Sequence, residues 1–523
     1  MSPRRNRLFA AAGAAALVLA WWAASLVAGP FFVPPPWTTL SDTLLLLASP
    51  GSWSQVGVTL LRVGAGFLAA FAAGTTAGMA AGRRAEVESL LAPGTLFIQG
   101  IPPLLWAIPV ILVLGTGHLS PVLVIALICY PLVVLTVTEG MKTVPRHLEE
   151  MLQVFAPGHR PRLREVVVPH LRPFFASSLR LGVTLGIKAS VVGEYFGADD
   201  GIGFQIQAAY QTLQIRRLFA WGLVLVALIL VTSRALTGLL GPGRRGREPA
   251  GGGPGAPARG APAAGVAAGA GLASPASTSG VVPGRAESAP CSGREAARVR
   301  SLLMSRRRPS SLILDRVSYA YPAGGAPGSP LLEGVSLYVG PGDIAVIYGE
   351  SGVGKTTLLK IAASLLPPRS GEVRTPRRAG VVFQDDRLIP WRTVLWNVAV
   401  PVRYQGFHPR EACCLARLLL REVGLEESAA AAPEELSGGM KKRAALARCF
   451  ARFPDLTLLD EPFSGLDREA RRMLWERFFH LMSEFPCPAV VVTHYPEELE
   501  GYPGCSFYEL SGRPAALRPV RGA

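Results

Sequence analysis

One stretch of the chain has the residue types and spacing needed to hold phosphate groups. It lies between a short β-branched run at 344–348 and a helical pattern that begins at Thr356. Glycine backbone N–H groups and the helix N-terminus would face the phosphates. Lys355 would reach the terminal phosphates, and the Thr356 hydroxyl would bind Mg²⁺. The stretch matches G-x-x-x-x-G-K-[ST] and predicts a nucleoside triphosphate site at Gly349, Glu350, Ser351, Gly352, Val353, Gly354, Lys355, Thr356 and the adjoining Thr357.

Polar side chains also follow two apolar runs that we interpret as strands. The run at 456–459 ends in Asp460 and Glu461, and the run at 381–383 ends in Gln384. We expect Asp460 and Gln384 to ligate Mg²⁺, and Gln384 to lie on a mobile loop beside the attacking water. Glu461 would polarise that water as the general base. Paired acids after a strand are common, so this pattern indicates a catalytic site only in combination with the other motifs.

A second glycine-rich element lies at 436–440, ahead of a helical pattern at 441–450. Its sequence Leu-Ser-Gly-Gly-Met would build another anion-binding helix N-terminus. The string resembles the signature element of ABC ATPases, although Met440 stands where glutamine is commoner. The resemblance implies an α/β P-loop NTPase domain of ABC type. It also implies that Ser437, Gly438 and Gly439 close over the γ-phosphate bound to a partner subunit, so that two copies assemble.

The same resemblance assigns three further positions. It places Asp467 in the D-loop of the nucleotide site, His494 against the γ-phosphate and Tyr321 on the adenine ring. A histidine or tyrosine at a strand end often packs without touching a ligand. The order of the motifs along the chain favours the nucleotide roles instead. We therefore expect an active ATP hydrolase with ATP and Mg²⁺ as its cofactors.

The N-terminal half is rich in apolar stretches long enough to cross a bilayer. Apolar residues make up 49% of the 523-residue chain, whose formal net charge is +16. Arginines cluster beside the apolar runs, which favours a positive-inside membrane protein over a nucleic-acid partner. We interpret the first run as an uncleaved span with a cytoplasmic N-terminus, not as a signal peptide. An all-α domain with about six spans is expected, at 8–28, 57–81, 90–114, 121–137, 173–192 and 218–240.

The loop between the fourth and fifth expected spans carries a distinctive pattern. A short apolar helical segment begins at Glu150, and a Val-Val-Val-Pro run closes the loop at 166–169. The pattern resembles the EAA loop of ABC importer permeases, in which a coupling helix docks on the ATPase. Ala156 replaces the usual glycine, and 151–152 replace two alanines. Leu152 and Phe155 would form the apolar knob that such a helix needs. The alternative is an amphipathic surface helix without a partner.

Strings at 58–67, 101–109, 193–203 and 388–398 resemble the nitrate/sulfonate/taurine group of ABC importers. The resemblance implies a pair of fused permease–ATPase chains and a separate extracytoplasmic substrate-binding protein. A homodimer is favoured, and pairing with a second fused subunit is the alternative. It implies import of a small solute across the cytoplasmic membrane, with the ATPase domain and both termini in the cytoplasm. Nitrate, sulfonates, taurine, pyrimidines and vitamin precursors all use permeases of similar sequence. The alternatives are an ABC exporter half-transporter and an ATP-driven signalling or remodelling protein that moves no solute.

Three ionisable residues lie in or beside the expected spans, where a charge is costly. They are Arg62, Lys188 and Glu194. Lys188 and Glu194 are six positions apart, which excludes a direct i,i+4 pair on one helix. Pairing with another span or snorkelling is favoured, and contact with a solute is the second hypothesis.

Composition divides the chain into three parts. We expect a permease domain at 1–240 and an ATPase domain at 311–523. The intervening 241–310 is rich in glycine, alanine, proline and serine, which predicts a disordered linker because it has little apolar surface to bury.

Overall fold

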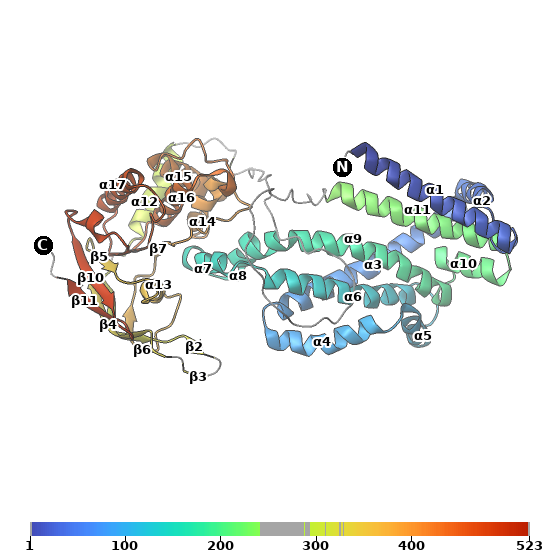
Figure 1. The fold of residues 1–523 in the computed structure, drawn as a ribbon, viewed down its shortest axis with the longest axis horizontal. Helices are drawn as coiled ribbons and strands as arrows, with labels where there is room; N and C mark the ends of the chain where they lie inside the picture. Colours follow the sequence, from blue (N-terminus) through green and yellow to red (C-terminus); the bar gives the residue numbers. More distant parts are fainter. Residues whose placement is uncertain are drawn as a thin grey trace. The chain divides into compact units, whose positions relative to one another are not determined.

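The chain folds into two units, shown by the computed structural model in Figure 1. The structure describes residues 3–240, 287, 293–308, 310–323, 326–327 and 329–520. The helical unit comprises the described residues of 1–144 and 170–254, and the α/β unit comprises 145–169 and the described residues from 255 onward. Residues 145–169, which we call the coupling segment, therefore pack with the C-terminal half of the chain.

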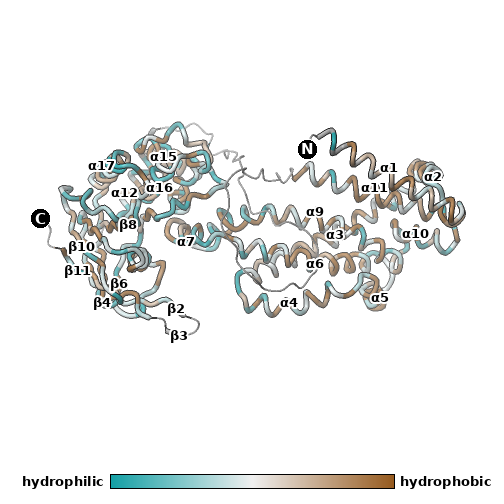
Figure 2. The backbone as a smooth tube through the Cα atoms, viewed as in Figure 1, coloured by the Kyte–Doolittle hydropathy of each residue, from teal (hydrophilic) through white to brown (hydrophobic). Residues whose placement is uncertain are grey.

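Long apolar helices build the helical unit, as the hydropathy colouring of Figure 2 shows. Among its described residues, five helices are long and apolar enough to cross a membrane. These are α1 (Pro3–Ala28), α3 (Pro50–Ala81), α6 (Leu119–Lys142), α9 (Val168–Gly197) and α11 (Ile215–Leu239). The shorter helices are α2 (Pro36–Ala48), α4 (Ala85–Gly100), α5 (Pro103–Leu114) and α10 (Ile202–Gln211).

The expected span at 90–114 is not one continuous helix. Helices α4 and α5 meet at an angle of 98°. Pro103 begins α5, and Pro102 precedes it in an extended conformation. Proline lacks an N–H and disfavours the helical conformation in the residue before it, so these two prolines end α4 at this point. The described residues hold six candidate spans if the bent pair counts as one.

Small residues let α3 and α6 pack closely. A Cβ atom added at Gly74 would lie 2.8 Å from the Val133 Cβ atom, and one at Gly78 would lie 2.8 Å from the Val134 carbonyl oxygen. Both distances are too short for a real side chain. Glycine is therefore required on this face of α3, as is usual where membrane helices approach each other.

The α/β unit is organised around a six-stranded sheet in the order β11-β10-β5-β9-β8-β7. The five strands from β10 to β7 are parallel, and β11 is an antiparallel edge. Their bounds are β5 (Ile344–Tyr348), β7 (Ala379–Val382), β8 (Leu456–Asp460), β9 (Ala489–Val492), β10 (Cys505–Ser511) and β11 (Ala516–Val520). An antiparallel sheet contains β4 (Leu332–Val339), β1 (Leu312–Tyr319) and β6 (Ser370–Arg374), and a two-stranded ribbon pairs β2 (Pro322–Ala323) with β3 (Ala326–Pro327).

Helices connect and cover these strands. The coupling segment contributes α7 (Arg146–Phe155), α8 (His159–Pro161) and the π-helix η1 (Arg162–Val167). Helix α13 (Lys355–Ala362) follows β5, and α17 (Arg468–Glu484) follows β8. Between β7 and β8 lies a helical insert of α14 (Val394–Arg403), α15 (Pro409–Glu422), η2 (Pro433–Glu435) and α16 (Gly438–Ala451). The short η3 (Pro496–Leu499) follows β9.

The expected disordered linker does not extend to residue 310. Residues Gly293–Ser305 form helix α12, which buries Ala296, Val299 and Leu303. These three positions recur at helical spacing, so the end of the segment has an apolar face. Burial of that face offsets the conformational entropy that the segment loses when it forms a helix. The expectation of disorder is wrong for α12, whereas 241–286 lies outside the described residues.

Candidate functional site

The predicted nucleotide residues come from four neighbouring strands of the parallel sheet. The sheet order places β5, β9, β8 and β7 side by side. The phosphate-binding loop follows β5, His494 follows β9, Glu461 follows β8 and Gln384 follows β7. Because parallel strands end at one edge, residues from across 349–494 of the sequence meet there, where ligands bind in such sheets.

The loop after β5 is closed around its lysine. The Lys355 ammonium group donates hydrogen bonds to the carbonyl oxygens of Gly349 at 2.8 Å and Glu350 at 2.9 Å. Burial lowers the pKa of Lys355. A Cβ atom at Gly349 would lie 2.2 Å from the Leu510 carbonyl oxygen, so only glycine fits there. Of the remaining loop residues, Ser351 and Gly352 are exposed, whereas Val353 and Gly354 are buried.

Two oxygen donors lie together at the start of α13. The Thr356 hydroxyl donates a hydrogen bond of 3.2 Å to the Asp460 carboxylate. Burial raises the pKa of Asp460, and the hydrogen bond from Thr356 opposes that rise. A hydroxyl next to a carboxylate is the kind of oxygen donor set that Mg²⁺ prefers. The pair therefore fits the expected metal ion.

The Glu461 carboxylate lies between the other two predicted catalytic side chains. Its oxygens are 2.7 Å from the His494 Nε2 atom and 3.2 Å from the Gln384 amide nitrogen, which donates a hydrogen bond. Glu461 has a φ of 45°, in the left-handed region that glutamate rarely adopts. Such conformations cluster at active sites, and the sequence carried no sign of this one.

Tyr321 lies beside the helix that follows the phosphate-binding loop. Its hydroxyl group shares a hydrogen bond of 3.1 Å with the Thr357 hydroxyl. Its ring meets the Tyr319 ring edge-on, with 5.0 Å between centroids. The side chain is half exposed, so one ring face remains accessible to a planar ligand.

Four predicted site residues lie elsewhere in the α/β unit. Ser437 caps α16 by accepting a hydrogen bond from the Met440 N–H, and Gly438 and Gly439 form the first turn of that helix. Asp467 caps α17 in the same way. Among the described residues, no hydrogen bond joins these four to the phosphate-binding loop. The fold thus gathers the other predicted residues and leaves the signature residues at a separate helix N-terminus.

Comparisons with known proteins agree with both halves of this architecture. Residues 332–464 match the family described as "ABC transporter". Residues 70–246 match "Binding-protein-dependent transport system inner membrane component". The taurine import ATP-binding protein TauB of Chromobacterium violaceum is 40% identical over 197 residues, which are 36% of this chain and 74% of the relative.

The chain belongs to the ABC transporter family. The aliphatic sulfonates import ATP-binding protein SsuB of Granulibacter bethesdensis is 42% identical over 170 residues, which cover 32% of this chain and 68% of that protein. Both relatives align with the ATPase part alone, and the permease part is matched by its own family. As an ABC transporter, this chain joins an importer-type permease to an ATPase whose hydrolysis of ATP is coupled to transport.

The coupling segment of this ABC transporter docks on the ATPase fold through an apolar knob. Leu152 and Phe155 of α7 are buried, as the sequence predicted. The Arg448 guanidinium lies over the Phe155 ring, 5.3 Å from its centroid. An unpartnered surface helix is therefore excluded for α7.

Glu150, at the start of the knob, carries an ionic contact. Its carboxylate lies 2.8 Å from Arg387 and 3.2 Å from Lys360. Burial alone would raise the pKa of Glu150, but hydrogen bonds from both cations hold it below its usual range. Sequence reasoning missed these two cations, because neither belongs to a local motif.

In the permease half, a buried ionic cluster joins two helices. Arg62 of α3 lies 3.3 Å from the Glu194 carboxylate of α9, and it also pairs with the Asp200 carboxylate. Glu194 in addition accepts hydrogen bonds from the Thr59 hydroxyl at 3.0 Å and the Gly203 N–H at 2.9 Å.

This cluster confirms that Arg62 and Glu194 pair across spans. Arg62 also meets the His118 ring nitrogen at 2.7 Å. Lys188, on α9, is exposed and does not join the cluster. The charge of Arg62 is therefore already balanced in this structure.

Proposed function

We propose that this ABC transporter imports a small organic sulfonate such as taurine. The observation that carries the proposal is the likeness of its ATPase half to taurine and aliphatic sulfonate import ATP-binding proteins. The permease strings that resemble the nitrate/sulfonate/taurine group support the same solute class. The match to a binding-protein-dependent component favours import over the exporter and signalling alternatives.

Hydrolysis of ATP would begin at the carboxylate of Glu461. A water bound against this carboxylate would lose its proton to Glu461 as its oxygen attacks the γ-phosphorus, while the bond from the γ-phosphorus to the bridging oxygen breaks and ADP leaves with that oxygen. His494 and Gln384 hold the two carboxylate oxygens and so fix the direction of the base. His494 is 42% exposed and can turn towards the γ-phosphate without leaving the site.

The nucleotide itself would be held by the loop at 349–357 and by Tyr321. Lys355 would exchange its two carbonyl partners for phosphate oxygens, a charge-assisted contact that is stronger than the ones it replaces. Thr356, Asp460 and Gln384 would hold Mg²⁺, which neutralises charge on the phosphates. Adenine would stack on the accessible ring face of Tyr321.

Two copies of the chain would be needed for a complete site. Ser437, Gly438 and Gly439 form a helix N-terminus, whose first N–H groups have no partner within the helix. Within the described part of the chain, no hydrogen bond joins these residues to the loop of their own chain. Such a terminus attracts an anion. We propose that it closes over the γ-phosphate on a second copy, with Asp467 nearby, which makes the working assembly a homodimer.

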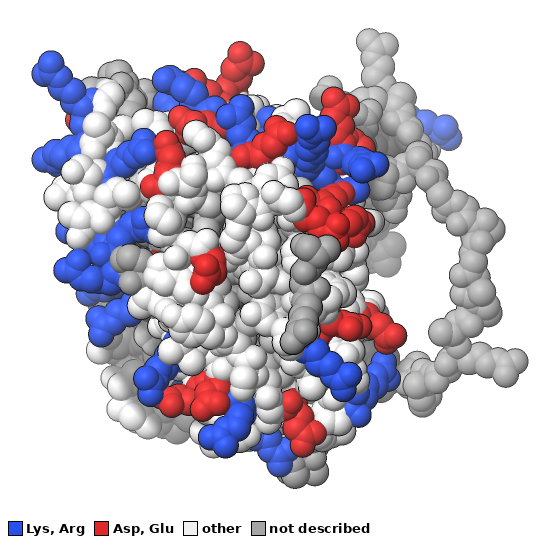
Figure 3. All heavy atoms as spheres, turned by 90° about the vertical axis from the view of Figure 1, so that its left-hand side faces the viewer, with Lys and Arg blue, Asp and Glu red and all other residues white. Residues whose placement is uncertain are grey.

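A separate binding protein would deliver the solute on the outer side of the cytoplasmic membrane. The coupling segment packs with the ATP-binding unit, which supports a cytoplasmic position for the chain between α6 and α9. This orientation puts Arg83 and Arg84 in the cytoplasm too, consistent with the positive-inside rule. The surface of the α/β unit in Figure 3 carries acidic and basic side chains together, which argues against a nucleic-acid partner.

The test is ATP hydrolysis by the full chain in lipid nanodiscs with candidate binding proteins. Stimulation by a taurine- or sulfonate-loaded binding protein, absent from the Glu461→Gln variant, is the expected result. Stimulation only by a nitrate- or pyrimidine-loaded binding protein would show that the solute is not a sulfonate. Hydrolysis indifferent to every binding protein, but raised by hydrophobic compounds, would overturn import.

A further inference from the structure

The coupling segment holds a second ion-paired carboxylate, at Glu165 in η1. This side chain is fully buried although it belongs to a short loop between two long helices. A π-helical turn such as η1 is rare in proteins, and where one occurs it often lies at a functional site. Burying a carboxylate is costly unless its oxygens are satisfied, so its partners indicate why it is there.

The partners of Glu165 all come from the helical insert or the loop that leads into it. Arg392 lies 2.8 Å from one carboxylate oxygen, to which the Trp396 indole N–H also donates at 3.0 Å. The Tyr404 hydroxyl donates to the other oxygen at 2.8 Å, and the Trp391 indole N–H donates to the Glu165 carbonyl oxygen at 2.8 Å.

These donors form a pocket that is built for one carboxylate. Burial, together with the Glu165 charge, raises the pKa of Tyr404, so its hydroxyl stays a proton donor. The Arg392 guanidinium stacks over the Trp396 ring at 5.1 Å, which fixes its direction. Without Glu165, the three polar groups would lose a shared, charge-assisted acceptor.

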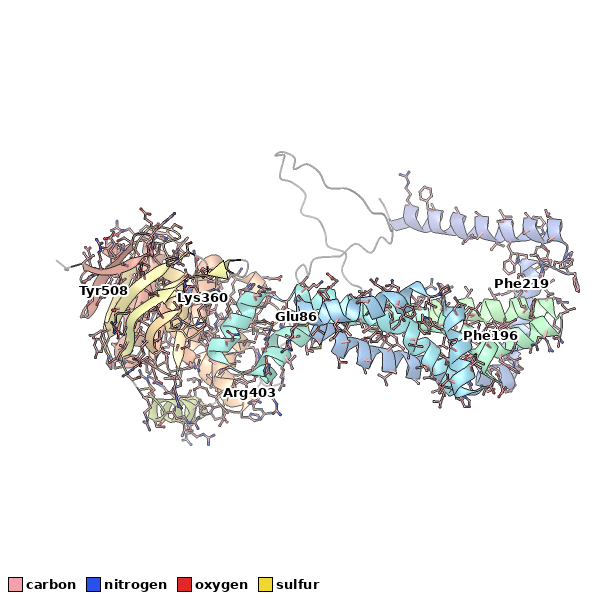
Figure 4. The ribbon with its side chains drawn as sticks, turned by 90° about the horizontal axis from the view of Figure 1, so that it is seen from below. Glu86, Phe196, Phe219, Lys360, Arg403 and Tyr508 are labelled. Carbon is pink, nitrogen blue, oxygen red and sulfur yellow. The ribbon has the colours of Figure 1, made fainter. Side chains whose placement is uncertain are left out.

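The two ion-paired glutamates Glu150 and Glu165 contact partly different elements of the α/β unit. Both carboxylates contact the loop before α14, Glu150 through Arg387 and Glu165 through Arg392. Glu150 also contacts Lys360 on α13, the helix after the phosphate-binding loop, whereas Glu165 also contacts α14 and its C-terminal end. Lys360 and Arg403, the last residue of α14, mark these two elements in Figure 4. Any movement of the helical insert against the sheet must therefore pull on the two ends of the segment differently.

The segment between the two glutamates is braced internally. Arg162 of η1 donates two hydrogen bonds to Glu149 of α7, at 2.8 and 2.7 Å. This bidentate pair holds α7 and η1 at a fixed angle. A pull at Glu165 is then transferred to the whole segment and to α9, which continues directly from η1.

We propose that Glu165 is a positioning residue that ties the coupling segment to the helical insert, so that movement of the insert on ATP binding is passed to α9. The inference rests on ATP-driven transport but not on the identity of the solute. In this arrangement Glu150 follows the nucleotide loop and Glu165 follows the insert that carries the signature residues.

The test compares Glu165→Gln, Arg392→Gln and the double variant with Arg160→Gln, an exposed charge of the same segment, as the control. Full chains are reconstituted in proteoliposomes with a taurine-loaded binding protein, and taurine uptake per ATP hydrolysed is measured. Glu165→Gln should lower this ratio about fivefold or more while basal hydrolysis remains. The double variant should be no worse than Glu165→Gln alone, because Glu165→Gln already removes the ion pair that Arg392→Gln removes.

A second measurement needs no solute. Amide hydrogen exchange of 162–167 in nanodiscs should rise about tenfold in Glu165→Gln and stay unchanged in Arg160→Gln. The inference would be overturned if Glu165→Gln showed the same amide exchange and the same uptake per ATP as the wild type. It would also be overturned if the losses of uptake per ATP in the two single variants added up in the double variant. A wild-type chain that hydrolyses ATP without taurine uptake would overturn only the proposed solute, because the exchange measurement still decides on Glu165.

Discussion

The nucleotide site and the ionic cluster of the permease contain the same kinds of side chain but differ in what those side chains do. Each combines carboxylates, a basic group, a histidine and a hydroxyl. In the nucleotide site the carboxylates contact a hydroxyl, an amide and an imidazole, and the one lysine bonds to carbonyl oxygens. In the permease, Arg62 is surrounded by two carboxylates and is almost fully buried.

The difference shows how the surroundings decide between catalysis and structure. Charges that are held apart, in a partly exposed site, remain available to a ligand. Charges that neutralise each other in a dry interior stabilise a contact between spans, because breaking the pair would leave an uncompensated charge. The predictions below change one region at a time and compare the outcomes.

The largest effect is expected at Glu461. Glu461→Gln keeps the size and hydrogen bonding of the side chain but removes the base, so the hydrolysis rate should fall by about 10²–10⁴-fold. ATP binding should remain, which a filter-binding assay with labelled ATP would show. Glu469→Gln, an exposed acid on the first turn of α17, is the control. Unchanged hydrolysis in Glu461→Gln would mean that another group is the base.

Substitution of Glu194 in the ionic cluster of the permease should lower the stability of the protein. Glu194→Ala leaves Arg62 partly uncompensated and should lower the free energy of unfolding by about 3 kcal/mol or more. Lys188→Ala, at an exposed position of the same helix, should change it by less than about 0.5 kcal/mol. Thermal unfolding of the purified chain measures both. A Glu194→Ala variant of normal stability that has lost only uptake would show that the cluster contacts solute.

Asp460 gives a pH-dependent test within the nucleotide site. Because burial raises its pKa, the folded protein binds the proton of Asp460 more tightly than the unfolded chain does. The stability that comes from the protonated form is present at low pH and is lost as the pH rises through the raised pKa.

Asp460→Asn removes this titration. Without nucleotide, the variant should therefore be more stable than the wild type at neutral pH. The gain should shrink as the pH falls towards the pKa of Asp460 in the unfolded chain. Melting curves at several pH values measure it, with the exposed Asp315→Asn as the control. A gain that is independent of pH would contradict the explanation.

The smallest effect is expected at Tyr321. Loss of a stacked ring costs about 1 kcal/mol, so Tyr321→Ala should raise the KM for ATP roughly fivefold with little change in kcat. Tyr321→Phe keeps the ring and loses only the hydrogen bond to Thr357, so its KM should stay near the wild-type value. Equal effects of the two substitutions would indicate that the hydroxyl matters and the ring does not.

The residues that the fold brings to one edge of the sheet could be found from the sequence because each lies in a short local motif. Glycine spacing before Lys355, an apolar run before Asp460 and another before His494 all mark strand ends, and parallel strands bring their ends together. The left-handed backbone at Glu461 left no trace in the sequence, because it depends on the contacts around that residue.

Pairings between distant residues could not be predicted from one sequence. Glu194 and Arg62 are 132 positions apart, and Glu165 and Arg392 are 227 apart. Nothing local marks either pair. Helix α12 was missed for a different reason, since its three buried apolar residues follow a long segment of linker-like composition. Two adjacent prolines mark the bend between α4 and α5 in the sequence. They lie within a long apolar run, which by itself predicts one continuous span.

The central claim is that hydrolysis at Glu461 drives solute through the permease half of the same chain. It is tested most directly by taurine uptake into proteoliposomes that enclose ATP, with a taurine-loaded binding protein outside. The account predicts accumulation that requires enclosed ATP and disappears in Glu461→Gln. Equal uptake with and without ATP, or in wild type and Glu461→Gln alike, would contradict it.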